Sequence, residues 1–237
     1  MRFTELVQWR KLNDRNPSMP GLIDKVAVKA FVSDRIGAEW ITPTLWHGSL
    51  LPDTPPWPHP FVVKSRHGCN QRRFVLSDAT DWTEVRRAGA RWVWSPYGRW
   101  LDEWGYADVP RGILVEPFIG TAGVLPIDYK LYVFHGHVAA IQVHLDRARD
   151  HRWLLMDRDW LRLSRSADTP PRPARLGAMI AAAEQLGIGF DFVRIDFYDI
   201  DPHPRFGEMT FYPGSGLDPF DPLDLDDWLG RLWREGA

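Results

Sequence analysis

The stretch FVRIDFYDIDPHPRFGEMTFYPGSG, residues 192–216, has the pattern of a β-hairpin. Side chains on a strand alternate between its two faces. This alternation puts Arg194 and Asp196 on one face of the first strand, and Glu208 and Thr210 on one face of the second. The segment between the strands, Asp-Pro-His-Pro, cannot continue a strand. With the turn centred near this segment, Asp196 is expected directly across from Glu208.

The two facing carboxylates indicate a cation site. Cross-strand neighbours lie about 4.5–5.5 Å apart at Cβ, and like charges at that distance repel. Among Ile, Phe, Tyr and Met side chains the pair would be costly without a cation, and oxygen ligands favour a hard ion such as magnesium. Removing one carboxylate is therefore expected to leave the metal-free protein as stable as before, or slightly more stable. The alternative is an exposed face with two solvated acids, because a one-residue slip in register would turn one acid away.

The composition is that of a globular chain. Its 237 residues fit one large domain or two small lobes, with 44% hydrophobic and 25% charged residues. The net charge of −2 gives no indication of the basic surface that nucleic-acid binding requires. The single cysteine, Cys69, excludes an internal disulfide and a multi-cysteine zinc site. The sequence has no apolar run of signal-peptide or bilayer-spanning length, so a cytoplasmic protein without membrane insertion is expected. Of its 13 Trp, several lie at 92–104, where core packing is favoured over stacking on sugars.

Hydrophobic periodicity predicts an α+β fold, with helices and an antiparallel sheet in succession. Helices are expected at 22–37, 80–94, 174–187 and 224–235, with Thr80 or Asp81 as the cap of the second. Strands are expected at 61–64, 73–77, 112–119 and 152–157, with a hairpin at 128–145.

Several charged residues stand where they could meet a nucleotide. Lys64 ends an apolar strand and precedes a turn that contains Gly68, an arrangement that suits phosphate, although a solvated lysine is the common alternative. Lys25 is expected in the first turn of a helix, where the dipole disfavours a positive charge. Asp128 and Lys130 share one face of a strand, as an ion pair or as ligand contacts.

The strand ending in ILVEPF carries a further acidic residue. Its backbone at 116–119 could offer a hinge to a purine ring, whereas Glu116 taken alone is expected to be solvated. The chain shows no nucleophile elbow, Walker loop or Rossmann fingerprint.

Taken in chain order, these segments resemble the ATP-grasp enzymes, and specifically the TupA-like branch named for teichuronopeptide biosynthesis. The resemblance covers nearly the whole chain, and the hairpin also resembles the metal hairpin of D-alanine–D-alanine ligase, an ATP-grasp relative. The segments that carry it are ELVQWRKLNDRNP, DKVAVKAFVSDRIG, FVVKSRHG, ILVEPFI, DYKLYVFHG, DRARDHRWLLMDRDW, FVRIDFY and FGEMTFYPGSG.

The resemblance implies a single catalytic unit over residues 1–237 in which two α+β lobes hold ATP between antiparallel sheets. The implied limits are 38–118 for the smaller lobe, 119–237 for the larger lobe with the metal hairpin, and 1–37 for an N-terminal helical segment. A departure from the family is the phosphate loop, which is poorer in glycine here; Arg72 and Arg73 are candidates to compensate.

Site roles follow from the resemblance by matched position. The nucleotide contacts are implied for Lys25, Lys64, Gly68, Glu116, Pro117, Phe118, Ile119, Asp128, Lys130 and Met209, with the lysines at 25 and 64 on phosphates, 116–119 at adenine and Asp128 at ribose. The magnesium ligands, for two ions, are implied to be Asp196, Glu208 and Thr210, the last in place of the usual Asn. The catalytic groups are implied to be Arg194, Lys64 and Lys130. The substrate candidates are Arg147, His151, Arg152, Gly214, Ser215 and Gly216.

The implied activity is ATP-dependent ligation of a carboxylate to an amine through an acyl phosphate, in cell-surface polysaccharide or peptide-conjugate assembly. The substrates would be small molecules, such as an amino acid and a uronic-acid glycan. Catalysis would rest on positioning and charge neutralisation, without a covalent nucleophile. Two alternatives stay open at this point: a small-molecule kinase, and a non-catalytic protein that binds a nucleotide or a carbohydrate.

Overall fold

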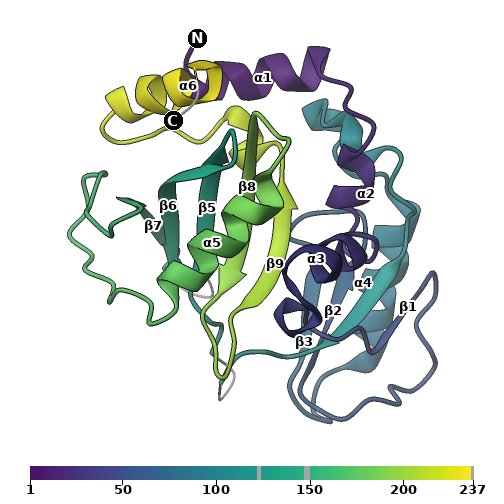
Figure 1. The fold of residues 1–237 in the computed structure, drawn as a ribbon. Helices are drawn as coiled ribbons and strands as arrows, with labels where there is room; N and C mark the ends of the chain where they lie inside the picture. The colour runs from purple at the N-terminus through teal and green to yellow at the C-terminus, as the bar shows by residue number, and fades with distance from the viewer. Residues whose placement is uncertain (122–123, 147–149, 236–237) are drawn as a thin grey trace. The chain divides into compact units, whose positions relative to one another are not determined.

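The computed structural model describes residues 1–121, 124–146 and 150–235, and its chain divides into two compact units (Figure 1). Unit 1 comprises residues 1–15, 32–40 and 125–237, and unit 2 comprises residues 16–31 and 41–124. The first 40 residues are thus shared between the units. Each unit contains its own antiparallel sheet.

Unit 2 is built on a four-stranded sheet in the order β1-β4-β2-β3. The strands are β1 (Trp46–Gly48), β2 (Phe61–Ser65), β3 (Arg72–Val75) and β4 (Ile113–Pro117). Its helices include α2 (Met19–Ile23) and α4 (Trp82–Trp94), with short 3-10 turns η2 (Arg99–Leu101) and η3 (Trp104–Tyr106).

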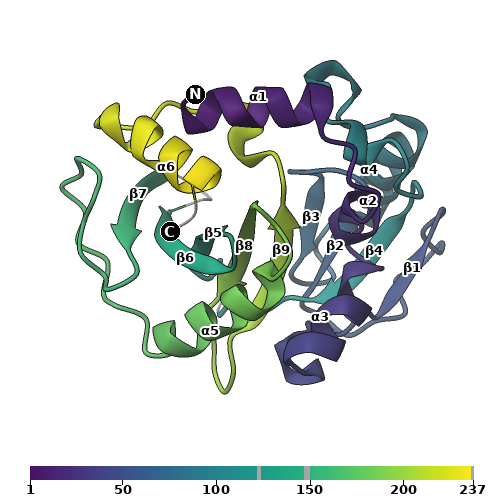
Figure 2. The same cartoon turned by 45° about the horizontal axis from the view of Figure 1, so that its top comes forward.

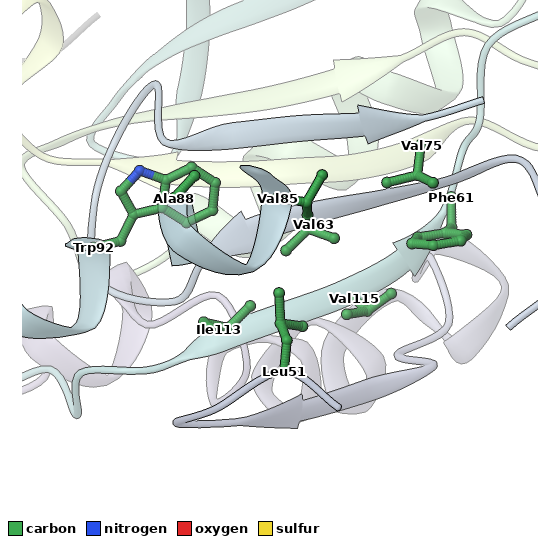
Figure 3. Close-up of a cluster of buried hydrophobic side chains, with 9 residues drawn as sticks. All are labelled: Leu51, Phe61, Val63, Val75, Val85, Ala88, Trp92, Ile113 and Val115. Atoms are coloured by element: carbon green, nitrogen blue, oxygen red, sulfur yellow. The ribbon is translucent and has the colours of Figure 1, made fainter. Parts of the chain in front are cut away.

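Helix α4 begins where the sequence predicts a cap. The Asp81 carboxylate accepts hydrogen bonds from the backbone N–H groups of Thr83 and Glu84, which have no partner within the helix. The buried side of α4 then packs on β2 and β4 around an apolar cluster (Figure 3). The cluster comprises Leu51, Phe61, Val63, Val75, Val85, Ala88, Trp92, Ile113 and Val115. The predicted core role is therefore confirmed for Trp92 and is wrong for Trp94 and Trp100, which are 85% and 76% exposed.

Unit 1 is built on a five-stranded sheet in the order β7-β6-β5-β8-β9. The strands are β5 (Asp128–Phe134), β6 (His137–Leu145), β7 (Arg152–Asp157), β8 (Phe192–Tyr198) and β9 (Arg205–Thr210). Its helical elements are α1 (Phe3–Asn13), α5 (Leu176–Gly187), α6 (Asp224–Glu235), η1 (Ala38–Trp40) and η4 (Pro213–Gly216).

Helices α1 and α6 lie side by side, and α5 packs on β5, β6 and β8 (Figures 1 and 2). Phe3 of α1 contacts the rings of Tyr132, Phe134 and Phe192, which alternation places on one face of the sheet. Helix α1 therefore covers one end of that face and leaves the polar positions beyond it for the site described below.

The α+β class is confirmed, as are the predicted strands and hairpins. The single helix expected at 22–37 is wrong, because the chain turns at 24–27 between α2 and α3 (Val28–Ile36). The Asp24 carboxylate accepts from the backbone N–H of Val26, a local contact that favours a turn. Lys25 consequently lies in this turn, outside any helix. None of the helices in the described ranges combines the length and apolarity that crossing a bilayer requires.

Candidate active site

Strand pairing in unit 1 gathers most of the predicted site residues on one sheet face. Lys130 lies opposite Asp196, Tyr132 lies opposite Arg194, and Asp128 lies opposite His144. Because partners in register point to the same side, these side chains share one face with the residues of β9 that oppose β8. The face therefore carries both cations and carboxylates at neighbouring positions.

Asp196 is the buried centre of this charged face. Only 1% of the residue is exposed, and its carboxylate accepts from the Lys130 ammonium group and from two nitrogens of Arg194 at 2.8 and 2.9 Å. Burial on its own would raise the pKa of Asp196, but the charges of Arg194 and Lys130 outweigh it and hold that pKa well below its usual range. Solvation of this acid, the alternative left open by the sequence, is therefore wrong.

Lys130 also pairs with Asp128, whose Oδ2 lies 2.7 Å from the ammonium nitrogen. Both side chains are buried, so one ammonium group links two carboxylates of adjacent strands. The ion pair that the sequence offered as one interpretation of these two residues is thus present.

Arg194 contacts every oxygen-bearing side chain that the family resemblance assigns to magnesium. Besides Asp196, its Nη2 donates to Glu208 Oε1 at 3.3 Å and to Thr210 Oγ1 at 3.1 Å. Burial would lower the pKa of Arg194, whereas the Asp196 carboxylate raises it, and the net shift is upward. The guanidinium is therefore charged and fixed among these oxygens.

The register of the hairpin agrees with the sequence prediction, since Asp196 pairs with Glu208 and Arg194 pairs with Thr210. This register depends on a bulge between Asp196 and Phe197, which accommodates Gly207 as the additional residue on β9. A Cβ at Gly207 would lie 3.2 Å from the Asp196 carbonyl oxygen, so the strands approach closely here. Met209, assigned to the nucleotide by resemblance, is buried opposite Ile195.

The oxygens of Asp196, Glu208 and Thr210 have the chemistry that magnesium prefers, but they do not form an open ligand set. Each of them already accepts a hydrogen bond from Arg194. Within residues 1–121, 124–146 and 150–235, no group of three or more His, Cys, Asp or Glu side chains is arranged to hold a metal ion. The residues as arranged therefore do not fit the expected ion.

A pocket adjoins this charged face within unit 1. Its volume is about 40 Å³. It is lined by Phe3, Thr4, Tyr132, Gln142, His144, Trp153, Arg194, Pro213, Gly214, Asp218 and Phe220. Gly214 and Ser215 of η4 have positive φ values of 53° and 56°, a conformation that suits glycine, and Ser215 is 8% exposed. Gln8 of α1 donates to the carbonyl groups of Ser215 and Gly216, which fixes this loop beside the pocket.

His144 is a pocket residue that the sequence reasoning missed. Its Nδ1 lies 2.8 Å from Nε2 of His151, and its own Nε2 is buried with no hydrogen-bond partner among the described residues. Burial, reinforced by the charges of Lys130 and Arg194, lowers the pKa of His144 to about 2. Alternation along β6 could have placed His144 on the polar face, although nothing local marked it as buried.

The remaining substrate candidates of this region lie at its periphery. His151 is exposed and contacts His144, while Arg152 pairs with Asp146 and Asp150 at 2.7 and 3.3 Å. Arg147 lies outside the described residues. The acids near Arg152 satisfy its charge in this structure.

Unit 2 holds a second buried cluster, centred on Glu116. Its carboxylate pairs with Lys64 at 2.7 Å and with the ammonium group of Lys29, and the residue is only 5% exposed. Burial would raise the pKa of Glu116, but the two lysines hold it below the usual value. The prediction of a solvated Glu116 is therefore wrong. Burial also lowers the pKa of Lys29, a residue that the sequence reasoning missed because its partner is 87 positions away.

The other nucleotide candidates of unit 2 lie around this cluster and the predicted phosphate loop. Lys25 donates to the carbonyl oxygen of Gly68 at 2.7 Å. In the predicted hinge, Pro117 has no N–H, and the N–H of Phe118 is already bonded to the Pro60 carbonyl group. The backbone N–H of Ile119 makes no hydrogen bond within the described residues.

The two antiparallel sheets are those of the ATP-grasp fold. N5-carboxyaminoimidazole ribonucleotide synthetase from Thermus thermophilus has this architecture, with a TM-score of 0.50 and 14% identity over 88% of this chain and 51% of that chain. D-alanine–D-alanine ligase from Bacillus anthracis matches with a TM-score of 0.48 and 13% identity, over 90% of this chain and 63% of that one. The ATP-grasp ligase PsnB, complexed with minimal precursor, matches at 0.48 and 12%, over 90% and 61%. The chain thus spans less than two thirds of these structures.

Within this fold class, the chain belongs to the TupA-like ATPgrasp family, whose sequence model matches residues 5–234. The family resemblance inferred from the sequence is therefore confirmed. A search of curated proteins returned no match.

Proposed function

We propose that this protein is an ATP-dependent carboxylate–amine ligase. The observation that carries the proposal is the convergence of Lys130 and Arg194 on the buried carboxylate of Asp196, beside a pocket that Arg194 also lines. Fixed cations of this kind stabilise the charge that develops when a phosphoryl group is transferred. Membership of an ATP-grasp family supports ATP as the phosphoryl donor.

In the proposed reaction, a carboxylate oxygen of the substrate attacks the γ-phosphorus of ATP, and ADP leaves. The nitrogen of a neutral amine then attacks the acyl carbon, and inorganic phosphate leaves as the amide bond forms. Arg194 would hold the transferring group and Lys130 would neutralise its charge, while Lys29 and Lys64 of unit 2 would contact nucleotide phosphates. The backbone N–H of Ile119 would serve adenine, and Asp128 the ribose. No step is assigned to magnesium, because Arg194 occupies its expected ligands.

The pocket in unit 1 supports a small substrate, since it combines Arg194 with the polar side chains of His144, Gln142 and Asp218 and with aromatic walls. By family resemblance, the proposed setting is cytoplasmic assembly of a cell-surface polysaccharide or peptide conjugate. An amino acid and a uronic acid are the proposed substrate classes.

The test screens amino acids, uronic acids and small peptides for substrate-dependent release of ADP and inorganic phosphate. With the correct carboxylate, hydroxylamine should intercept the acyl phosphate as a hydroxamate. Arg194→Ala should reduce turnover far more than ATP affinity, because its contact is made mainly in the transition state. Arg158→Ala, which removes an exposed arginine paired with Glu184, is the matched control and should retain activity.

Two outcomes would contradict the ligase proposal. Stoichiometric ADP with a stable phosphorylated product and no free phosphate would identify a kinase. Absence of saturable ATP binding would favour a protein without nucleotide chemistry.

A further inference from the structure

His144 and His151 form a pair of imidazole rings beside the pocket of unit 1. Their nearest nitrogens, Nδ1 of His144 and Nε2 of His151, lie 2.8 Å apart, which is a hydrogen-bond distance. His144 is half-buried and lines the pocket, whereas His151 is exposed. The two rings therefore connect the wall of the pocket to the solvent.

The remaining nitrogen of His144 has the position of a proton acceptor. This atom, Nε2, is buried and has no hydrogen-bond partner among the described residues. A neutral imidazole has one N–H group and one acceptor nitrogen, so the pair has two arrangements. In the first, Nδ1–H of His144 donates to His151, and Nε2 of His144 is an acceptor. In the second, Nε2–H of His151 donates to His144, and Nε2 of His144 carries a proton.

The charges around His144 favour the passage of a proton through the ring over its storage there. Burial lowers the pKa of His144 to about 2, and the charges of Lys130 and Arg194 are the next causes. The Asp196 carboxylate opposes them, and His151 reinforces them. A charged imidazole is therefore unfavourable at this position. Conversion of the first arrangement into the second avoids that charge, because His144 loses the Nδ1 proton as it accepts one at Nε2.

The pocket suits a neutral amine. Its volume of about 40 Å³ gives room for one small polar group at the end of a substrate. Arg194, which is proposed to hold the transferring phosphoryl group, lines the same pocket as His144. A group beside the imidazole would thus lie close to the reacting atoms. The nearby guanidinium disfavours an ammonium ion and favours the neutral amine, which is the form that attacks an acyl phosphate.

We propose that His144 and His151 form a proton relay for the amine in the second step of the ligation, with His144 as the catalytic base. As the amine nitrogen bonds to the acyl carbon, the bond from that carbon to the phosphate oxygen breaks, and its electron pair leaves with the phosphate. One proton of the amine passes to Nε2 of His144, and its bonding pair stays on nitrogen. The Nδ1 proton of His144 passes to Nε2 of His151, which releases its own Nδ1 proton to water.

After the product leaves, exchange with water at both ends of the pair restores the first arrangement. The inference rests on the proposed ligase function and deepens it, since it assigns the pocket to the amine substrate. Its tests are therefore chosen to separate the relay from the ligase activity.

The first measurement examines the pair without any substrate. Nitrogen-15 NMR near pH 7 should show a neutral His144 ring whose two nitrogen shifts change in His151→Ala, because the variant removes the hydrogen-bond partner of Nδ1. His137→Ala removes an exposed histidine of the same strand and should leave those shifts unchanged. A His144 ring that carries both protons, or that does not respond to the loss of His151, would overturn the proposal.

The second measurement separates the two chemical steps. Hydroxylamine attacks acyl phosphates without a catalyst, so hydroxamate formation reports the first step, whereas amide formation reports both. With the carboxylate and amine found in the screen, the ratio of the amide rate to the hydroxamate rate should fall about 100-fold in His144→Gln and about tenfold in His151→Ala, given the usual size of general-base catalysis. His137→Ala should keep the wild-type ratio.

Imidazole in the buffer supplies a further readout, which a merely structural role would not move. In His151→Ala the exposed position is open to solvent, so added imidazole can accept the Nδ1 proton of His144 and should restore amide formation. The same imidazole should not restore His144→Gln, which lacks the ring that meets the amine.

The outcomes distinguish the relay from the ligase. Absence of hydroxamate from the wild-type protein with every carboxylate would contradict the ligase function, and the relay with it. An unchanged ratio in His151→Ala would overturn the relay and leave the ligase intact. An equal fall of the hydroxamate and amide rates would indicate a structural role and would likewise overturn it. If His144→Gln fails to fold, His151→Ala and its response to imidazole decide the question.

Discussion

A single buried carboxylate, Asp196, organises the charges of the unit 1 site. The sequence correctly predicts that Asp196 lies opposite Glu208. It also predicts that the two facing carboxylates destabilise the metal-free protein by repulsion, whereas the structure indicates that Asp196 stabilises it. Asp196 is neutralised by Lys130 and Arg194, whereas Glu208 is partly exposed and shares only one contact with Arg194. The positive charge that the sequence predicts beside Asp196 is thus supplied by Lys130 on the neighbouring strand and by Arg194 on the same strand.

This arrangement predicts that Asp196→Asn destabilises the metal-free protein. The change would leave two buried cations with too little negative charge, and breaking a buried pair in this way costs about 3 kcal/mol or more. Glu208→Gln should cost about 1 kcal/mol or less, because its carboxylate is part-exposed. Urea denaturation of both variants in the presence of a chelator measures the difference. An Asp196→Asn variant as stable as the wild-type protein would show that the cations do not depend on this acid.

At the scale of secondary-structure elements, the sequence predicted the features that depend on residues close together in the chain. Alternation identified the strands, and Asp81 marked the start of α4. The turn at 24–27 was missed because apolar spacing continued through it. The Glu116 cluster was beyond sequence reasoning for a different reason: its lysines are 52 and 87 positions away, and only the fold brings them together.

The hairpin bulge supplies a prediction at this scale. Gly207→Ala would place a Cβ about 3.2 Å from the Asp196 carbonyl oxygen, a backbone atom that cannot rotate away. Crowding of this kind costs about 1–3 kcal/mol. Gly177→Ala is the matched control, because the new Cβ in α5 would meet nothing within 4 Å and alanine favours helix. Thermal unfolding should therefore show a lower midpoint for Gly207→Ala and an equal or higher one for Gly177→Ala. Equal midpoints for wild type and Gly207→Ala would show that the bulge tolerates a side chain.

For the whole molecule, the burial of charge implies a stability that depends on pH. His144 has its pKa lowered to about 2 by burial and by neighbouring cations, whereas an unfolded histidine titrates near 6.5. Below about pH 6.5, His144 therefore binds a proton in the unfolded chain but not in the folded chain. The free energy of unfolding consequently falls as the pH falls. Glu116 and Asp196 have depressed pKa values, so the stability they contribute is present above the unfolded carboxyl pKa and is lost at more acidic pH.

Between pH 7 and pH 5 the carboxyl groups contribute little, and His67, whose pKa burial also lowers, adds the same slope to the wild-type protein and to the variants below. The free energy of unfolding should fall there by up to about 1.4 kcal/mol per pH unit from His144 alone. In His144→Gln this part of the slope should disappear, whatever the variant's stability at pH 7. His137→Gln removes an exposed histidine of the same strand and should retain the wild-type slope. Urea denaturation at several pH values gives the three slopes. Parallel curves for wild type and His144→Gln would mean that His144 takes up its proton without unfolding, and that the pocket admits a charged imidazole beside Lys130 and Arg194.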